Sequence, residues 1–97
     1  MDKQVNYMNI LKRFKQEHGT QYGIKSLGIF GSVARNQHNK NSDVDIIMEA
    51  PEIDLFTCIN IRNQLEKMMG VPVDLVTKSE FLRPRFKARL ESEVIYV

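Results

Sequence analysis

Hydrophobic and polar residues follow two spacings along this chain, and these predict alternating helices and strands. Apolar side chains three and four positions apart predict a first helix over residues 2–18, with Gly19 ending it. The same spacing continues from Asp54, a candidate N-cap, to Gly70, where a second long helix is expected to stop. A last helix is predicted to begin at Ser79, which would cap it. The apolar residues expected on its inner face are Phe86, Leu90 and Val94.

Short apolar runs separate these helices and predict the strands of a small sheet. Residues 24–30, 43–50 and 71–77 are long enough for full strands, and residues 95–97 predict a shorter one. A short helical stretch and a polar loop join the first two strands. The resulting order, α-β-(short α)-β-α-β-α-(β), predicts the α+β class. We expect a single domain over residues 1–97, with helices packed on a small mixed β-sheet.

Composition narrows the class of protein. The chain has 97 residues, of which 42% are hydrophobic and 27% charged, as is ordinary for a globular domain. This length allows one compact core and leaves no room for a separate acceptor-binding domain. Cys58 is the only cysteine, so no intramolecular disulfide can form. We find no signal peptide and no apolar run near the roughly 20 residues that span a bilayer, so a cytoplasmic protein without a membrane partner is expected.

Charge is distributed unevenly along the chain. The net charge of +2 is too small to argue for nucleic-acid binding, and no basic stripe interleaved with aromatic residues is present. No direct contact with nucleic acid is therefore expected. The central residues 31–77 carry seven acidic and four basic side chains, whereas both flanking regions have more basic than acidic ones. Any cation-binding chemistry is therefore expected in the middle of the chain.

Two carboxylates lie close together in the second predicted strand. Asp43 and Asp45 are two positions apart, so both point to the same face of the sheet, roughly 7 Å apart along the strand. Such a pair repels itself and loses hydration, which a bound cation would offset. Oxygen ligands suit Mg²⁺, which usually takes one or two carboxylates together with substrate phosphates. The pair therefore predicts a magnesium site.

A glycine and a serine end the first predicted strand. Gly31 permits a sharp turn there, and Ser32 begins the short helical stretch. Exposed backbone N–H groups at such a turn can hold phosphate. Asp74, a third acid, lies in the middle of the apolar third strand. If that strand pairs with the second, three carboxylates can hold two metal ions for phosphoryl or nucleotidyl transfer, and Asp74 can help deprotonate the attacking hydroxyl.

The order Gly31-Ser32, ten residues, then Asp43-Val44-Asp45 resembles the signature of the DNA polymerase β-type nucleotidyltransferase superfamily. The small size resembles its minimal nucleotidyltransferase (MNT) branch, whose members are antitoxins paired with HEPN-domain ribonuclease toxins. The resemblance covers nearly the whole chain. It implies a nucleotidyltransferase core, ATP as a substrate and transfer of AMP to a tyrosine hydroxyl of a HEPN-domain partner, which blocks the toxin.

The resemblance also implies roles for single residues. Gly31 and Ser32 hold the β- and γ-phosphates, and Asp43 and Asp45 bind both Mg²⁺ ions. Asp74 matches the third acid by its place in the third strand, and so serves as a metal ligand and catalytic residue. Arg35, about one helical turn after Ser32, either reaches the triphosphate or forms a surface ion pair.

Three alternatives remain open from the sequence. The chain either modifies its partner or neutralises it by binding and masking it. A stand-alone transferase acting on a small molecule such as an aminoglycoside is the third possibility. A cluster of basic residues near the C-terminus is either a solvated helix face, a docking surface for an acidic partner or a contact to nucleotide phosphate. These residues are Lys78, Arg83, Arg85, Lys87 and Arg89.

Overall fold

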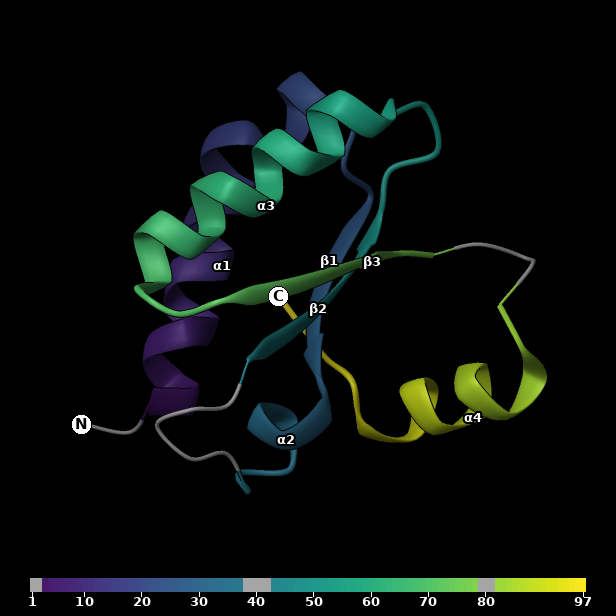
Figure 1. The fold of residues 1–97 in the computed structure, drawn as a ribbon. Coiled ribbons are helices and arrows are strands. Elements are labelled where there is room, and N and C mark those ends of the chain that lie inside the picture. Colours follow the sequence, from purple (N-terminus) through teal and green to yellow (C-terminus); the bar gives the residue numbers. More distant parts are fainter. Residues whose placement is uncertain (1–2, 38–42, 79–81) are drawn as a thin grey trace.

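The computed structural model describes residues 3–37, 43–78 and 82–97. Four strands form one sheet in the order β3-β2-β1-β4, with α1 and α3 on one face and α4 on the other (Figure 1). The sheet is mixed and covered by helices, so the predicted α+β class is confirmed. The elements are α1 (Lys3–Tyr22), β1 (Ser26–Phe30), α2 (Gly31–Ala34), β2 (Val44–Glu49), α3 (Leu55–Met69), β3 (Val73–Thr77), α4 (Pro84–Glu93) and β4 (Ile95–Tyr96).

Strand β2 runs through the middle of the sheet and meets two partners of opposite direction. It pairs antiparallel with β1 and parallel with β3, and β4 adds antiparallel to the other edge of β1. A parallel pair needs a long crossover, which α3 supplies between β2 and β3. This topology brings β2 and β3, which are far apart in sequence, side by side.

Alternation along the strands gives the sheet two different faces. Leu27, Ile46 and Met48 point to the side of α1 and α3 and belong to the main core, where each is fully buried. The opposite face carries a smaller cluster in which Phe30 and Ile47 pack against residues of α4. Asp45 lies on this second face, because it is the cross-strand partner of Phe30.

The first helix is longer than the sequence predicts. It runs to Tyr22 through Gly19, and Gly23, with a φ of 67°, follows it. Tertiary contacts explain the extra turn: the Tyr22 ring stacks on Phe14 at 6.4 Å, and its hydroxyl accepts a hydrogen bond from Gln64 at 3.3 Å. These contacts outweigh the low helix propensity of one glycine.

The third helix begins and ends where it was predicted. The Asp54 carboxylate accepts a hydrogen bond of 2.7 Å from the Thr57 backbone N–H, and Gly70 is the C-cap. That N-cap hydrogen bond lowers the pKa of Asp54.

The last helix differs from its prediction at both ends. Ser79, the predicted cap, lies outside the described residues, and α4 begins at Pro84 with Arg83 as its N-cap residue. Val94 was expected on the helix, but it has extended backbone angles and leads into β4. Proline at the first helical position fixes a helical φ, and pairing of β4 with β1 ends the helix. Across the described ranges, no helix combines the length and apolarity needed to cross a membrane.

Gly19→Ala tests the extended first helix. We expect the variant to be more stable by about 0.5–1 kcal/mol, because alanine favours a helix interior and a Cβ would meet only the Lys15 Cγ, at 3.6 Å. The free energy of unfolding in urea measures the change. As the control, Gly23→Ala is expected to lose about 1–2 kcal/mol, since its φ is 67°. Loss of stability in Gly19→Ala would contradict a helix that continues through this position.

Candidate active site

Gly31 is the turning point between β1 and α2. Its φ is 73°, a left-handed conformation that glycine adopts readily, and the residue is buried. A Cβ built on Gly31 would collide with the Asp45 carboxylate. Backbone angle and space therefore both require glycine, and the absence of a side chain lets the acid of β2 lie directly against the turn.

The short helix α2 is held in place by the first helix of the chain. The Gln4 side-chain amide donates hydrogen bonds to the carbonyl oxygens of Val33 and Ala34, at 2.9 and 3.1 Å. These contacts satisfy carbonyls at the end of a four-residue helix. They fix the segment that carries Ser32 and Arg35 beside the sheet.

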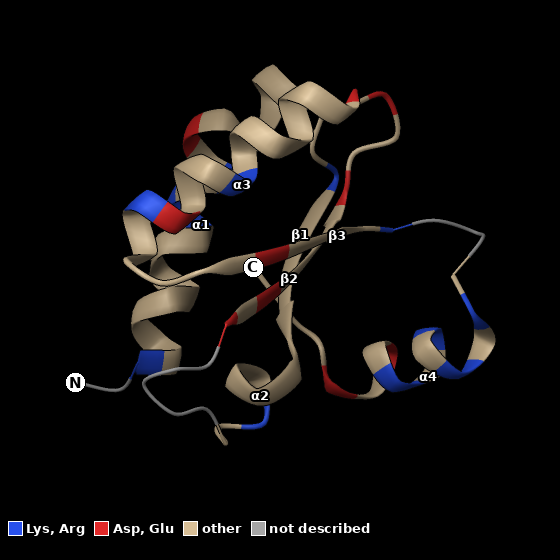
Figure 2. Ribbon diagram, in the orientation of Figure 1, with Lys and Arg blue, Asp and Glu red and all other residues tan. Residues whose placement is uncertain are grey.

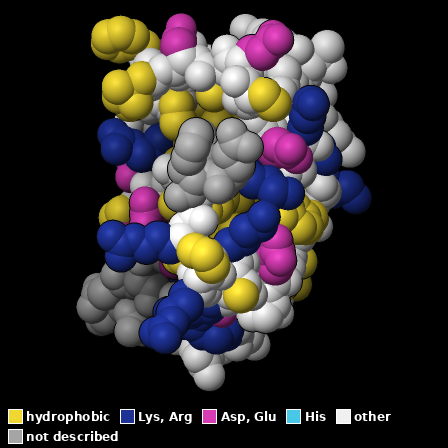
Figure 3. Space-filling view, turned by 90° about the vertical axis from the view of Figure 1, so that its right-hand side faces the viewer, with side chains coloured by type: hydrophobic (Ala, Val, Ile, Leu, Met, Phe, Trp, Pro, Cys, Tyr) yellow, Lys and Arg dark blue, Asp and Glu magenta, His cyan; other side chains and the backbone are white. Residues whose placement is uncertain are grey.

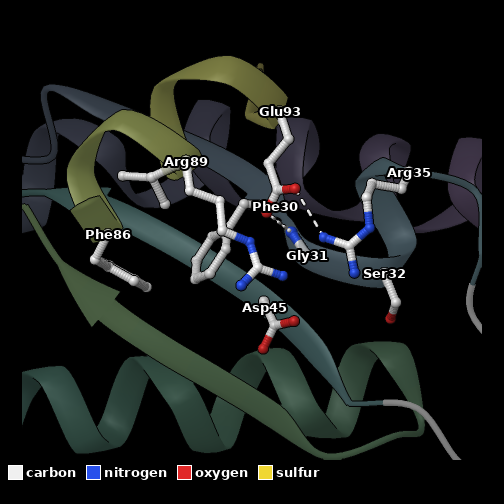
Figure 4. Close-up of a pocket in the computed structure, with 9 residues that line it drawn as sticks. Phe30, Gly31, Ser32, Arg35, Asp45, Phe86, Arg89 and Glu93 are labelled. Atoms are coloured by element: carbon white, nitrogen blue, oxygen red, sulfur yellow. Dashed lines mark hydrogen bonds and ion pairs between the residues drawn. The ribbon is translucent and has the colours of Figure 1, made fainter.

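A pocket of about 250 Å³ opens between this turn and α4. It collects four of the predicted site residues, Gly31, Ser32, Arg35 and Asp45, around one space (Figure 4). The opposite wall comes from α4, and its residues were not predicted as a wall of this site. The remaining lining residues are Phe30, Phe86, Arg89, Leu90 and Glu93.

The other two predicted acids lie beside Asp45 rather than in the pocket wall. Asp45 and Asp74 are register partners on the parallel strands β2 and β3, so their side chains share the face that α4 covers. Asp43 directly precedes β2 and is exposed. Figure 2 shows the acidic positions of the two strands next to each other in the middle of the sheet.

The pKa of Asp45 reflects its burial and its closeness to the other two carboxylates. Burial raises its pKa, and the charges of Asp74 and Asp43 raise it further, while Arg35 acts against them. Within residues 3–37, 43–78 and 82–97, however, no three acidic, histidine or cysteine side chains are grouped closely enough to hold a metal ion. The predicted sharing of ions by three carboxylates thus stays a prediction.

Glu93, the last residue of α4, connects that helix to the glycine turn. The Gly31 N–H donates to one oxygen of its carboxylate at 3.0 Å, and the Arg35 guanidinium donates to the other at 2.7 Å. Burial alone would raise the pKa of Glu93, but these two hydrogen bonds and the charges of Arg35 and Arg89 outweigh it and lower the pKa. Arg35 thus forms an ion pair and also lines the pocket.

The sequence predicted the pocket residues of the glycine turn, α2 and β2 but not the wall that α4 forms. Arg89 stood in the predicted basic cluster, with a phosphate contact as one of its possible roles, so a signal for it existed. Nothing in the sequence connected Glu93 to Gly31, which is 62 positions away. Phe86 was expected to face the core, yet it is 37% exposed and meets Phe30 edge to face, with ring centroids 6.0 Å apart.

Most of the chain matches a known family. Residues 8–97 match the family described as the nucleotidyltransferase domain. The chain belongs to the nucleotidyltransferase domain family. The matched range contains the whole pocket, so the glycine turn and the acids of β2 and β3 are parts of a nucleotidyltransferase domain.

Two archaeal relatives cover most of this nucleotidyltransferase domain. MJ0126 of Methanocaldococcus jannaschii, named as a candidate protein adenylyltransferase, is 38% identical over 89 residues, which are 91% of each chain. The protein adenylyltransferase MntA of Thermococcus cleftensis is 37% identical over 90 residues, 92% of this chain and 90% of its own.

Solved structures share the fold of this nucleotidyltransferase domain. One described as a candidate minimal nucleotidyltransferase has a TM-score of 0.74 and 27% identity, covering 98% of this chain and 95% of its own. A chain of a Shewanella oneidensis complex, described as a tri-AMPylated HEPN toxin with an MNT antitoxin, has a TM-score of 0.69 and 16% identity, covering 96% of this chain and 70% of its own. The second likeness concerns the fold alone.

Asp45→Asn tests the charge balance of the candidate site. Because the folded-state pKa of Asp45 is raised, the folded chain binds that proton more tightly than the unfolded chain does. The ionised group therefore costs stability above its folded-state pKa, and this cost disappears as the pH falls toward the ordinary value of 3.8. Without added metal, we expect Asp45→Asn to melt at a higher temperature than the wild type at neutral pH.

The melting-temperature difference is expected to shrink as the pH is lowered from 7 toward 4. Thermal denaturation followed by circular dichroism across this range measures it. Glu52→Gln, which removes an exposed carboxylate from the turn after β2, is the matched control. A variant that melts below the wild type at neutral pH would show that the Asp45 charge stabilises the fold.

Proposed function

We propose that this chain is a Mg²⁺-dependent protein adenylyltransferase and the antitoxin of a toxin–antitoxin pair. It transfers AMP from ATP to a tyrosine hydroxyl of a HEPN-domain toxin and so blocks the toxin's ribonuclease site. The observation that carries this proposal is the contact of Asp45 with the side-chain-free turn at Gly31, with Asp74 next to it in register. The proposed phosphate-binding turn and the Asp45 carboxylate thus border one pocket.

The relatives support the class of reaction and of partner. Two relatives that match about nine tenths of the chain carry protein adenylyltransferase names. A structure of the same fold comes from a complex described as a tri-AMPylated HEPN toxin with an MNT antitoxin. These two likenesses together support AMP as the transferred group and a HEPN-domain protein as the acceptor.

Gly31, Ser32 and Arg35 form the proposed phosphate-binding side of the site. All three line the pocket, and Figure 4 draws Arg35 and Asp45 on the same side of α4. A backbone N–H, a hydroxyl and a guanidinium are the donors that phosphate oxygens accept from. They would orient the β- and γ-phosphates so that the α-phosphate lies toward Asp45.

The acids fit a magnesium ion by their chemistry. Asp43, Asp45 and Asp74 offer carboxylate oxygens, which Mg²⁺ prefers. The raised pKa of Asp45 indicates that its surroundings compensate its negative charge poorly. A bound cation would supply that compensation. Asp43 and Asp45 are the proposed ligands of both ions and Asp74 of one. When bound, Mg²⁺ would supply electrostatic stabilisation of the charge that builds up on the phosphates.

The proposed reaction forms one P–O bond and breaks another. The tyrosine oxygen attacks the α-phosphorus of ATP and forms a new P–O bond, while the bond between the α-phosphorus and the bridging oxygen to the β-phosphate breaks. Asp74 takes the hydroxyl proton, and pyrophosphate leaves with the electron pair of the broken bond. Asp43 and Asp74 are exposed, so a hydroxyl on a second protein can approach them.

Asp43→Asn and Asp45→Asn test the proposed metal ligands. We expect each to lower AMP transfer by more than about a hundredfold, because removing a direct ligand should exceed the 10- to 100-fold cost of removing an outer partner. ATP labelled at the α-phosphate, incubated with the chain and a HEPN-domain partner protein, measures transfer. Glu52→Gln is the control and should transfer AMP at the wild-type rate.

Two further readings separate this function from its competitors. Transfer at the wild-type rate by both asparagine variants would refute the assigned site. Full protection of cells from the toxin by both variants, despite lost transfer, would instead indicate neutralisation by masking.

Because ATP is expected to bind only the folded chain, a hundredfold excess over its Kd should also raise stability by about 2.7 kcal/mol, roughly 10–20 °C in Tm.

A further inference from the structure

Two of the three donors that the proposed function assigns to phosphate are already hydrogen-bonded to an anion of this chain. The carboxylate of Glu93 receives the Gly31 N–H on one oxygen and the Arg35 guanidinium on the other, at 3.0 and 2.7 Å. Its side chain is only 13% exposed. Figure 4 shows the carboxylate between the glycine turn and Arg35, at the upper edge of the pocket.

A carboxylate and a phosphate oxygen compete for the same donors. Both are anionic acceptors, and both form short charge-assisted hydrogen bonds with guanidinium and backbone N–H groups. If the Glu93 carboxylate and a phosphate both lay at these two donors, the two anions would repel each other strongly at a separation of a few ångströms. The Gly31 N–H is a single donor, so a triphosphate that accepts from it must displace the Glu93 carboxylate.

A cation on the same helix, Arg89, also lines the pocket. Arg89 is one helical turn before Glu93, and its guanidinium points into the pocket above Asp45 (Figure 4). Across the described ranges, this guanidinium makes no hydrogen bond or ion pair. An arginine that faces a pocket bordered by acids, but is bonded to none of them, is well placed to bind an anionic ligand.

The position of Glu93 allows it to leave without unfolding the helix. It is the last residue of α4, and Val94 after it is already extended. The helix is held separately, by Leu90 packed on Phe30 and Ile47 and by the edge-to-face contact of Phe86. A change in the Glu93 side chain or the last helical turn can therefore free the donors while α4 stays docked.

We propose that α4 is part of the nucleotide site: Arg89 binds the triphosphate of ATP, and Glu93 is the internal anion that this triphosphate displaces. This inference rests on the proposed function, because it assumes that ATP binds at Gly31 and Arg35. It adds a substrate-binding residue and a built-in competitor to that site. Figure 3 views the molecule from the side on which α4 lies, where Lys and Arg side chains gather on the surface.

Equilibrium binding of ATP by isothermal titration calorimetry, with Mg²⁺ in excess, tests the proposal on the full chain. Glu93→Gln keeps the shape but removes the competing charge, so the Kd for ATP is expected to fall about tenfold or more. Arg89→Met keeps the apolar stem but removes the guanidinium, and should raise the Kd by about tenfold. Inorganic triphosphate should follow the same pattern, whereas neither change should alter the Kd of adenosine, which has no phosphate.

Matched controls come from the same helix. Glu91→Gln and Arg85→Met change exposed residues of α4 that do not line the pocket, and both should bind ATP within about twofold of the wild type. Circular dichroism and thermal denaturation without nucleotide verify that each variant is folded. If Glu93→Gln does not fold, Glu93→Ala provides the same comparison.

The outcomes separate the inference from the proposed function. If the wild type binds ATP and Glu93→Gln binds it equally or more weakly, Glu93 positions the donors and does not compete, and the inference is wrong. An unchanged Kd in Arg89→Met would remove Arg89 from the site. Binding by Glu93→Gln where the wild type shows none would support the competition directly. If no folded variant binds any nucleotide, the proposed function fails together with the inference.

Discussion

The close approach of the Asp45 carboxylate to the backbone of Gly31 is the constraint around which this site is built. It demands a residue without a side chain at the end of β1, in a left-handed conformation, and an acid opposite it at the start of β2. The antiparallel register of β1 and β2 places these two positions together. Any shift of that register by one residue would turn Asp45 into the main core, where an unpaired charge is very costly.

The two faces of the sheet have different roles: one mainly stabilises the fold, and the other carries the candidate site. The face toward α1 and α3 holds the larger cluster of fully buried residues, and most of the hydrophobic stabilisation comes from it. The face toward α4 has a small cluster of three buried residues, Phe30, Ile47 and Leu90, beside the carboxylates. The active-site face can therefore accept repelling charges, because the opposite face supplies the stability that offsets them.

Helix α4 joins these two roles through its own sequence. Leu90 faces the apolar cluster, and Arg89 and Glu93 face the pocket. The ion pair of Glu93 with Arg35 links residues 58 positions apart and so couples the C-terminal part of the chain to the glycine turn. If the phosphates of a nucleotide use the same donors, the occupancy of the site and the contacts of α4 are linked energetically.

How far the sequence predicted this molecule depends on the range of the interaction concerned. Asp54 and Gly70 were predicted correctly as the ends of α3, because capping is a contact between neighbours in sequence. Gly19 was not: its helix continues because Phe14 and Tyr22 pack together and Tyr22 is bonded to Gln64, across 42 positions. The family resemblance pointed to Gly31, Ser32, Asp43 and Asp45 through their spacing, and the fold brings Gly31 and Asp45 into contact.

The sequence by itself determined the order of elements, the glycine turn, the acidic pair and the α+β fold class. These follow from periodicity, backbone preference and short spacings, which act within a few residues of one another. Only the tertiary structure decided that Asp74 lies in register with Asp45, that α4 forms the second wall, and that Glu93 occupies the donors of the turn. Strand pairing and helix docking set those positions, because they depend on how distant apolar faces are buried together.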